Sequence, residues 1–281
     1  MGNRQPSSWE WNDHTPPWYV IGDSTLKEKC GRKHPLGHTT RHGEHDPYTF
    51  GFAMGLVIAS WGRFRVPSAL MPIAPKITGP QNILFRQMLQ DFVPPSWTRH
   101  VVVIADAGFA ANATLRLIAE KHYGYVFAMP RTRKFTNGQH LRDFVQHLPK
   151  SYYYRRASTK PDGRRQDYWV FVRHATLQKL GDVTLVLSKK RRNTGPKQVK
   201  IIVTNLTGAT AGTILSIYAR RWGVEICQSC NLRRTLFWPK FDSWGLHPAR
   251  RAVWGGEAWR PTPMGWPPMR GPTTCLMAIP A

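Results

Sequence analysis

The sequence predicts an α/β protein in which helices flank a mixed sheet and a β-rich insertion precedes the last helix. Two short apolar runs, residues 18–22 and 100–105, have the composition of buried strands, and each is followed at once by an aspartate. A helical pattern follows the second run, as in folds that alternate strands with helices. Between residues 131 and 196 the chain is basic and contains further strand-like runs, which predicts the insertion.

The N-terminal half is expected to supply most of the core sheet. After a basic connection rich in Gly and His, residues 48–60 and 63–71 have the pattern of two strands joined by a turn at Trp61 and Gly62. Residues 82–92 are amphipathic and precede two prolines, which predicts a helix. Gly108 permits a tight exit from the strand at 100–105. A helix over 112–121 and a strand over 123–129 are expected next.

The C-terminal half predicts a return to the core through one more strand and one more helix. Within the insertion, residues 167–174 and 182–188 have strand patterns, and residues 199–203 form the next buried strand. The last helix is expected to start near Thr210 or Thr213, because either side chain can cap it, and to continue through Glu225.

These patterns divide the chain into four parts. They are an irregular segment (1–17), a core (18–130 with 197–235), the insertion (131–196) and a tail rich in Trp, Pro and Arg (236–281). The tail holds no helical or strand period, and we interpret it as a segment read out of frame.

Positive charge is the strongest global signal. The 281 residues include 40 Lys and Arg but 16 Asp and Glu, which gives a formal net charge of +24. Such an excess is destabilising through self-repulsion unless a polyanion is the usual partner. A GC-rich genome would explain many arginines, but it would not explain the shortage of acids. The composition therefore predicts a nucleic-acid partner.

Other bulk features exclude a membrane protein and a disulfide-stapled one. The longest apolar run, residues 51–61, is too short to cross a bilayer. The 4 cysteines are scattered and do not form a disulfide framework. We expect a reducing, intracellular setting.

The scarcity of carboxylates draws attention to three of them. Asp23 and Asp106 follow the two apolar runs, and Glu225 lies on the last predicted helix. At 3.6 residues per turn, Tyr218, Arg221 and Glu225 fall within about 60° of one another on that helix. Carboxylates that meet at one point select Mg²⁺ or Mn²⁺, and Arg binds phosphate. The alternative is that each acid, taken singly, is an ordinary strand-end or helix-surface residue.

In these positions the sequence resembles the DDE transposases of bacterial insertion sequences, in particular the group with the helix signature Y-x2-R-x3-E-x6-K. Tyr218, Arg221 and Glu225 match the first three members of the signature at the correct spacing. The D-S-T that begins at Asp23 resembles the segment around the first aspartate, and the D-A-G-F that begins at Asp106 resembles the second. The resemblance covers about residues 18–228.

This resemblance implies a ribonuclease H-like core in which Asp23, Asp106 and Glu225 hold two Mg²⁺ or Mn²⁺ ions. Metal-activated water would free a 3′ hydroxyl at the end of the element, and that hydroxyl would attack target DNA. Tyr218 and Arg221 would bind phosphates near the cut. The implied partners are double-stranded DNA, as terminal inverted repeats and as target, and a second copy of the chain in a homodimer on paired ends. The implied location is the bacterial cytoplasm, at the nucleoid.

The sequence departs from the family pattern in two ways. The signature requires Lys seven residues after Glu225, but Leu232 occupies that position and Arg233 follows it, so Arg233 is the candidate replacement for DNA binding. Family members also begin with a longer DNA-binding region and continue through further helices. We therefore expect a truncated or frame-disrupted copy. Two other interpretations stay open: a catalytically silent DNA-binding remnant, and a ribonuclease H-like nuclease that cleaves without joining strands.

Overall fold

The computed structural model describes residues 9–10, 16–28, 36–42, 46–62, 64–74, 76, 79–98, 100–160 and 163–222. The chain divides into two compact units, residues 1–226 with residue 281 and residues 227–280, and every described residue belongs to the first unit. Glu225, Arg233 and the predicted tail at 236–281 lie outside the described residues.

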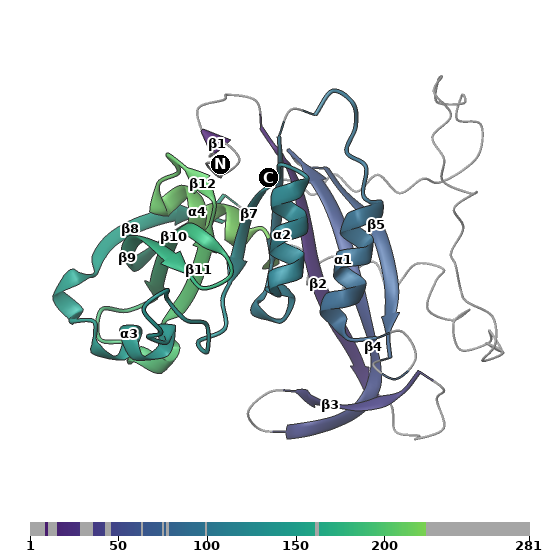
Figure 1. Cartoon of the computed structure of the whole chain (residues 1–281), viewed down its shortest axis with the longest axis horizontal. Helices are drawn as coiled ribbons and strands as arrows, with labels where there is room; N and C mark the ends of the chain where they lie inside the picture. Colours follow the sequence, from purple (N-terminus) through teal and green to yellow (C-terminus); the bar gives the residue numbers. More distant parts are fainter. Residues whose placement is uncertain are drawn as a thin grey trace. The chain divides into compact units, whose positions relative to one another are not determined.

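A ten-stranded mixed sheet forms the framework of the described residues (Figure 1). The strand order is β3-β4-β2-β6-β7-β11-β10-β9-β8, and β5 pairs with β4. The strands are β2 (Trp18–Glu28), β3 (His38–His42), β4 (Asp46–Trp61), β5 (Phe64–Ile73), β6 (Val101–Ala105), β7 (Gly124–Ala128), β8 (Tyr154–Thr159), β9 (Arg165–Leu177), β10 (Gly181–Lys189) and β11 (Lys200–Thr204). The pairs β2–β6 and β6–β7 are parallel and the others are antiparallel, so the predicted mixed sheet is confirmed. A separate two-stranded parallel sheet pairs β1 (Trp9–Glu10) with β12 (Leu206–Thr207).

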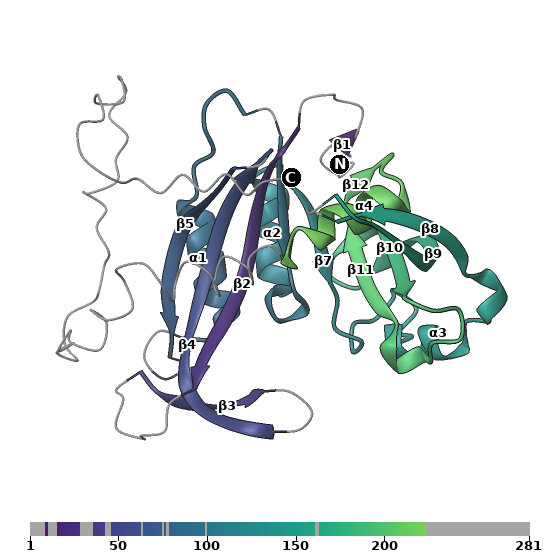
Figure 2. The ribbon, with the colours of Figure 1, turned by 180° about the vertical axis from the view of Figure 1, so that it is seen from behind.

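Helices cover both faces of the sheet. The helices are α1 (Gln81–Asp91), α2 (Asn112–Glu120), α3 (Leu141–His147) and α4 (Ala211–Ala219), with 3-10 turns η1 (Ala107–Phe109), η2 (Lys150–Tyr152) and η3 (Pro196–Gln198). Helices α1 and α2 pack side by side on one face, and α4 lies on the other (Figures 1 and 2). The core under α1 includes Phe85, Val20, Val103 and Phe127, all almost completely buried.

The far end of the sheet bends toward α4. Strand β8 is four places from β7 in the strand order, yet α4 contacts both strands. A flat sheet would separate strands four places apart by roughly 19 Å, since neighbouring strands lie about 4.8 Å apart. The strands of residues 131–196 therefore extend the core sheet and curl around the helix.

Most predicted elements are present, but their limits differ in informative ways. The sequence did not predict β3, β8 or α3, which are short and polar. The expectation that the first strand finishes at Asp23 is wrong, because β2 continues to Glu28 through antiparallel pairing with β4. Its parallel pairing with β6 does stop at Gly22. Pairing on one side alone is enough to prolong the strand.

The last helix also differs from its prediction. Thr210 is its N-cap and accepts a hydrogen bond from the Thr213 backbone N–H, as one of the two expected caps. Helix α4 ends at Ala219, however, and does not run unbroken to Glu225. The Arg221 N–H donates to the Tyr218 carbonyl at 3.1 Å, three residues back, which is the tightened bonding common at helix ends.

Candidate active site

The register of two parallel strands places Asp23 and Asp106 at neighbouring positions. In the β2–β6 pair, Ile21 lies opposite Ile104 and Gly22 opposite Ala105. Asp23 and Asp106 are the next residues of the two chains, and adjacent strands lie about 4.8 Å apart. Because side chains alternate between the two faces of a strand, both aspartates project to the same face of the sheet.

That face is the one covered by α4, and Gly22 shows why the other face is closed. A Cβ atom added at Gly22 would lie 2.2 Å from Cε2 of Phe85, the α1 ring that packs directly against the strand. Asp23, one residue further on, projects away from α1 and toward α4. On the same face, the Arg220 guanidinium lies 4.2 Å from the centre of the Tyr19 ring.

Asp23 forms a buried ion pair with Arg221, which follows the end of α4. Nη1 of Arg221 donates to Oδ2 of Asp23 at 2.8 Å, and the two side chains are 8% and 10% exposed. Oδ1 of Asp23 accepts the backbone N–H of Ser24 at 2.9 Å. Charge-assisted hydrogen bonds of this kind fix the carboxylate in one orientation.

Asp106 is held by neutral donors. Its Oδ1 accepts the Ala107 backbone N–H at 2.8 Å, as the N-cap of η1, and the Tyr218 hydroxyl at 3.4 Å. Nζ of Lys200 donates to the same Tyr218 oxygen at 3.4 Å and lies 4.9 Å from the ring centre. Burial, and secondly the nearby Asp106 carboxylate, raise the pKa of Tyr218 well above its ordinary value, so the phenol stays a hydrogen-bond donor at neutral pH.

The described residues bring together four of the six side chains that the sequence singled out: Asp23, Asp106, Tyr218 and Arg221. Glu225 and Arg233, the remaining two, lie outside the described residues. Within the described part of the chain, no group of three or more His, Cys, Asp or Glu side chains gathers as a set of metal ligands. The two aspartates fit a hard divalent cation by chemistry, since Mg²⁺ and Mn²⁺ take carboxylate oxygens.

Sequence reasoning missed Lys200 and Arg220, which both lie at this site. Lys200 opens the apolar strand β11, where a single cation beside buried residues could have been noticed. Arg220 directly precedes Arg221 of the signature, and no sequence pattern of its own marked it as a site residue. The site therefore carries three basic side chains against two described carboxylates, an arrangement suited to an anionic substrate.

A pair of acids at the edge of parallel strands, surrounded by cations, is typical of proteins that act on phosphate esters. The chain belongs to a family described as the transposase DDE domain, whose model matches residues 78–237, more than half of the chain. Asp106, Tyr218 and Arg221 lie within the matched range, and Asp23 lies before it. No curated protein matches the chain.

Among solved structures, the chain is similar to the piggyBac transposase in a cryo-EM structure of its synaptic complex with hairpin DNA. The sequence identity is 13% and the TM-score is 0.46, over 82% of this chain and 45% of that one. This chain thus spans less than half of the piggyBac protein. No helix in the described residues is long and apolar enough to span a bilayer.

Proposed function

We propose that the protein is a metal-dependent DNA transposase that cleaves and joins strands at the ends of a bacterial insertion sequence. The observation that carries the proposal is the placement of Asp23 and Asp106 on one face of adjacent parallel strands. Membership in the transposase DDE domain family supports it. The net charge of +24 supports DNA as the substrate.

In this proposal each side chain has a distinct role. Asp23, Asp106 and Glu225 hold the cofactor, two Mg²⁺ or Mn²⁺ ions, which when bound would activate water and neutralise charge at the scissile phosphate. The Tyr218 hydroxyl, steadied by Lys200, orients Asp106. Arg221 orients Asp23, and its guanidinium would also bind a phosphate oxygen near the cut.

The partners in this proposal are inverted-repeat and target DNA and a second copy of the chain, and Arg233 adds a DNA contact.

The second candidate is a DNA-binding protein that does not cut. The observation that favours it is the Arg221 guanidinium on Oδ2 of Asp23. A cation bound to that oxygen must share it with the guanidinium or displace it. Within the described residues, by contrast, both hydrogen bonds that Asp106 accepts fall on Oδ1, and none falls on Oδ2.

The test supplies Mn²⁺ or Mg²⁺ and a duplex that carries the element's own ends, taken from the nucleotides that flank the coding sequence. Joined products are the expected result, and EDTA should abolish them. Nicks without joining would indicate a nuclease, and binding without cleavage would indicate the silent remnant.

Asp106→Asn is the matched variant for this test. The change removes one negative ligand but leaves the shape and the basic surface, so cleavage should fall by at least about a hundredfold while DNA affinity stays within a few-fold. Cleavage that survives Asp106→Asn would refute the assignment of the metal site.

A further inference from the structure

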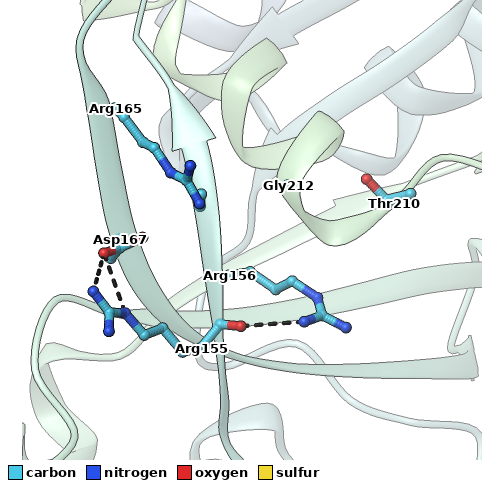
Figure 3. Close-up of a pocket in the computed structure, with 7 residues that line it drawn as sticks. Arg155, Arg156, Arg165, Asp167, Thr210 and Gly212 are labelled. Carbon is cyan, nitrogen blue, oxygen red and sulfur yellow. Dashed lines mark hydrogen bonds and ion pairs between the residues drawn. The ribbon is translucent and has the colours of Figure 1, made fainter.

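A second basic site lies at the opposite end of α4 from the two aspartates. A pocket of about 690 Å³ opens where the first turn of α4 meets β8 and β9, and it is lined by Arg155, Arg156, Ala157, Arg165, Asp167, Thr210 and Gly212 (Figure 3). Strand β8 is the last strand in the order of the sheet, so the pocket lies along a sheet edge. We call it the arginine pocket.

The charges of the arginine pocket are not balanced. Arg155 is paired with Asp167, and its Nε lies 3.1 Å from Oδ2 of that carboxylate. Arg156 donates to the backbone carbonyl of Arg155 at 3.3 Å, and its guanidinium lies 4.7 Å from the centre of the Tyr154 ring. No carboxylate of the described residues forms an ion pair with Arg156 or Arg165. Within the described part of the chain, two positive charges of the pocket thus have no carboxylate partner and are available to an anion.

The pocket is fixed to α4 by close packing. A Cβ atom at Gly212 would lie 2.7 Å from the Ala157 carbonyl oxygen, so only Gly allows this approach of the helix to β8. One turn further on, Oγ of Ser216 accepts the Thr159 backbone N–H at 2.9 Å and lies 3.2 Å from Oγ of Ser158. The helix therefore acts as a rigid spacer between the arginine pocket and the aspartates.

The length of the spacer sets the separation of the two sites. From Thr210 to Arg221 the chain advances eleven residues through α4 and the tightened turn that follows it, which corresponds to roughly 16 Å at about 1.5 Å per residue. Duplex DNA advances about 3.4 Å per base pair, so 16 Å corresponds to roughly five base pairs.

We propose that the arginine pocket binds the phosphodiester backbone of duplex DNA, roughly five base pairs from the phosphate that lies at Asp23 and Asp106. This inference rests on the proposed function. Guanidinium groups suit phosphate oxygens, and two arginines that have no carboxylate partner among the described residues can neutralise two neighbouring phosphates. The competing explanation is that charges on the edge strand β8 only prevent pairing with another sheet.

The first test measures how DNA affinity depends on salt. The double variant Arg156→Gln/Arg165→Gln should lower the slope of log K against log salt by about 2, since each phosphate contact contributes about 0.9. The matched control is Arg116→Gln/Lys179→Gln, which removes the same charge from exposed positions. Arg116 lies on α2, on the other face of the sheet, and Lys179 lies at the opposite end of β9 from Arg165. The control slope should change by less than about half as much.

The second test locates the contact. On a duplex whose cleaved phosphate has been mapped with the unaltered protein, single neutral methylphosphonate linkages are placed at successive positions. The unaltered protein should bind about tenfold more weakly when the linkage lies roughly five base pairs from the cut. The pocket variant should bind that duplex as tightly as it binds the unmodified duplex.

The outcomes separate this inference from the proposed function. If the unaltered protein neither binds nor cleaves DNA, the proposed function fails. If it does both but the pocket and control variants have equal slopes, the arginine pocket is not a phosphate site. A pocket variant that self-associates while keeping the original slope would show that the arginines protect the sheet edge instead.

Discussion

Asp23 and Asp106 occupy matching positions but depend on different partners. Asp23 is buried and is balanced by a full positive charge, whereas Asp106 accepts, among the described residues, a backbone N–H and a phenol. Removing a partner from a buried ion pair leaves a charge without compensation, which is far more costly than losing a neutral hydrogen bond. Removing the partner of Asp23 should therefore destabilise the fold more than removing a partner of Asp106.

Arg221→Met should lower the free energy of unfolding by roughly 3–5 kcal/mol, because it leaves the Asp23 carboxylate buried without its cation. Arg155→Met is the matched control. Arg155 also pairs with an aspartate, Asp167, but its side chain is 69% exposed, and exposed pairs contribute about 0–1 kcal/mol. Urea denaturation followed by circular dichroism measures both variants.

The double variant Asp23→Asn/Arg221→Met should recover part of the loss, because the unpaired charge is gone. Equal losses for Arg221→Met and Arg155→Met would contradict a buried ion pair at Asp23.

At this scale the sequence predicts some side chains better than others. Asp23 and Asp106 could be singled out because each follows an apolar run in a protein with few acids. The ion pair between Asp23 and Arg221 could not, since 198 residues separate them and only the placement of α4 on the sheet joins them. Lys200 could have been noticed as a single cation at the start of an apolar strand. Its contact with Tyr218 could not, since the two residues lie on different elements.

At the scale of elements, Gly22 determines how closely α1 packs on β2. Residues 18–22 were recognised as a strand by their apolar composition, but the need for Gly at position 22 is visible only when Phe85 is in place. In the same way, the extension of β2 to Glu28 depends on its partner β4 and not on its own sequence. Local pattern predicts that a strand exists, and the neighbouring strand determines its length.

Gly22→Ala should destabilise the protein by about 1–3 kcal/mol, because the new methyl group overlaps the Phe85 ring and α1 must move outward. Gly195→Ala is the control, since no atom lies within 4 Å of a Cβ atom at that position. Thermal unfolding compares the two variants. If Gly22→Ala unfolds at the same temperature as Gly195→Ala, α1 does not press on β2 as described.

At the scale of the whole molecule, positive charge opposes folding and favours a polyanionic partner. The composition alone indicated this balance, while the structure shows where some of the charge is used: Arg220 and Arg221 beside the aspartates, and the arginine pocket at the other end of α4. Basic side chains thus gather at both ends of α4: those of β8 and β9 lie at its start, and those of the two residues after the helix lie at its end. Composition could not reveal that arrangement, because it depends on the curl of the sheet.

The unfolding temperature should therefore rise with ionic strength. Between 10 and 150 mM NaCl the Debye length falls from about 30 Å to about 8 Å, which screens the repulsion among charges that sum to +24. A short DNA duplex added at 10 mM NaCl should raise the unfolding temperature further, because a bound polyanion neutralises the charge directly. Sucrose at matched osmolarity is the control, since it is uncharged and leaves the repulsion in place. An unfolding temperature that is the same in 10 and 150 mM NaCl would show that the excess charge does not oppose folding.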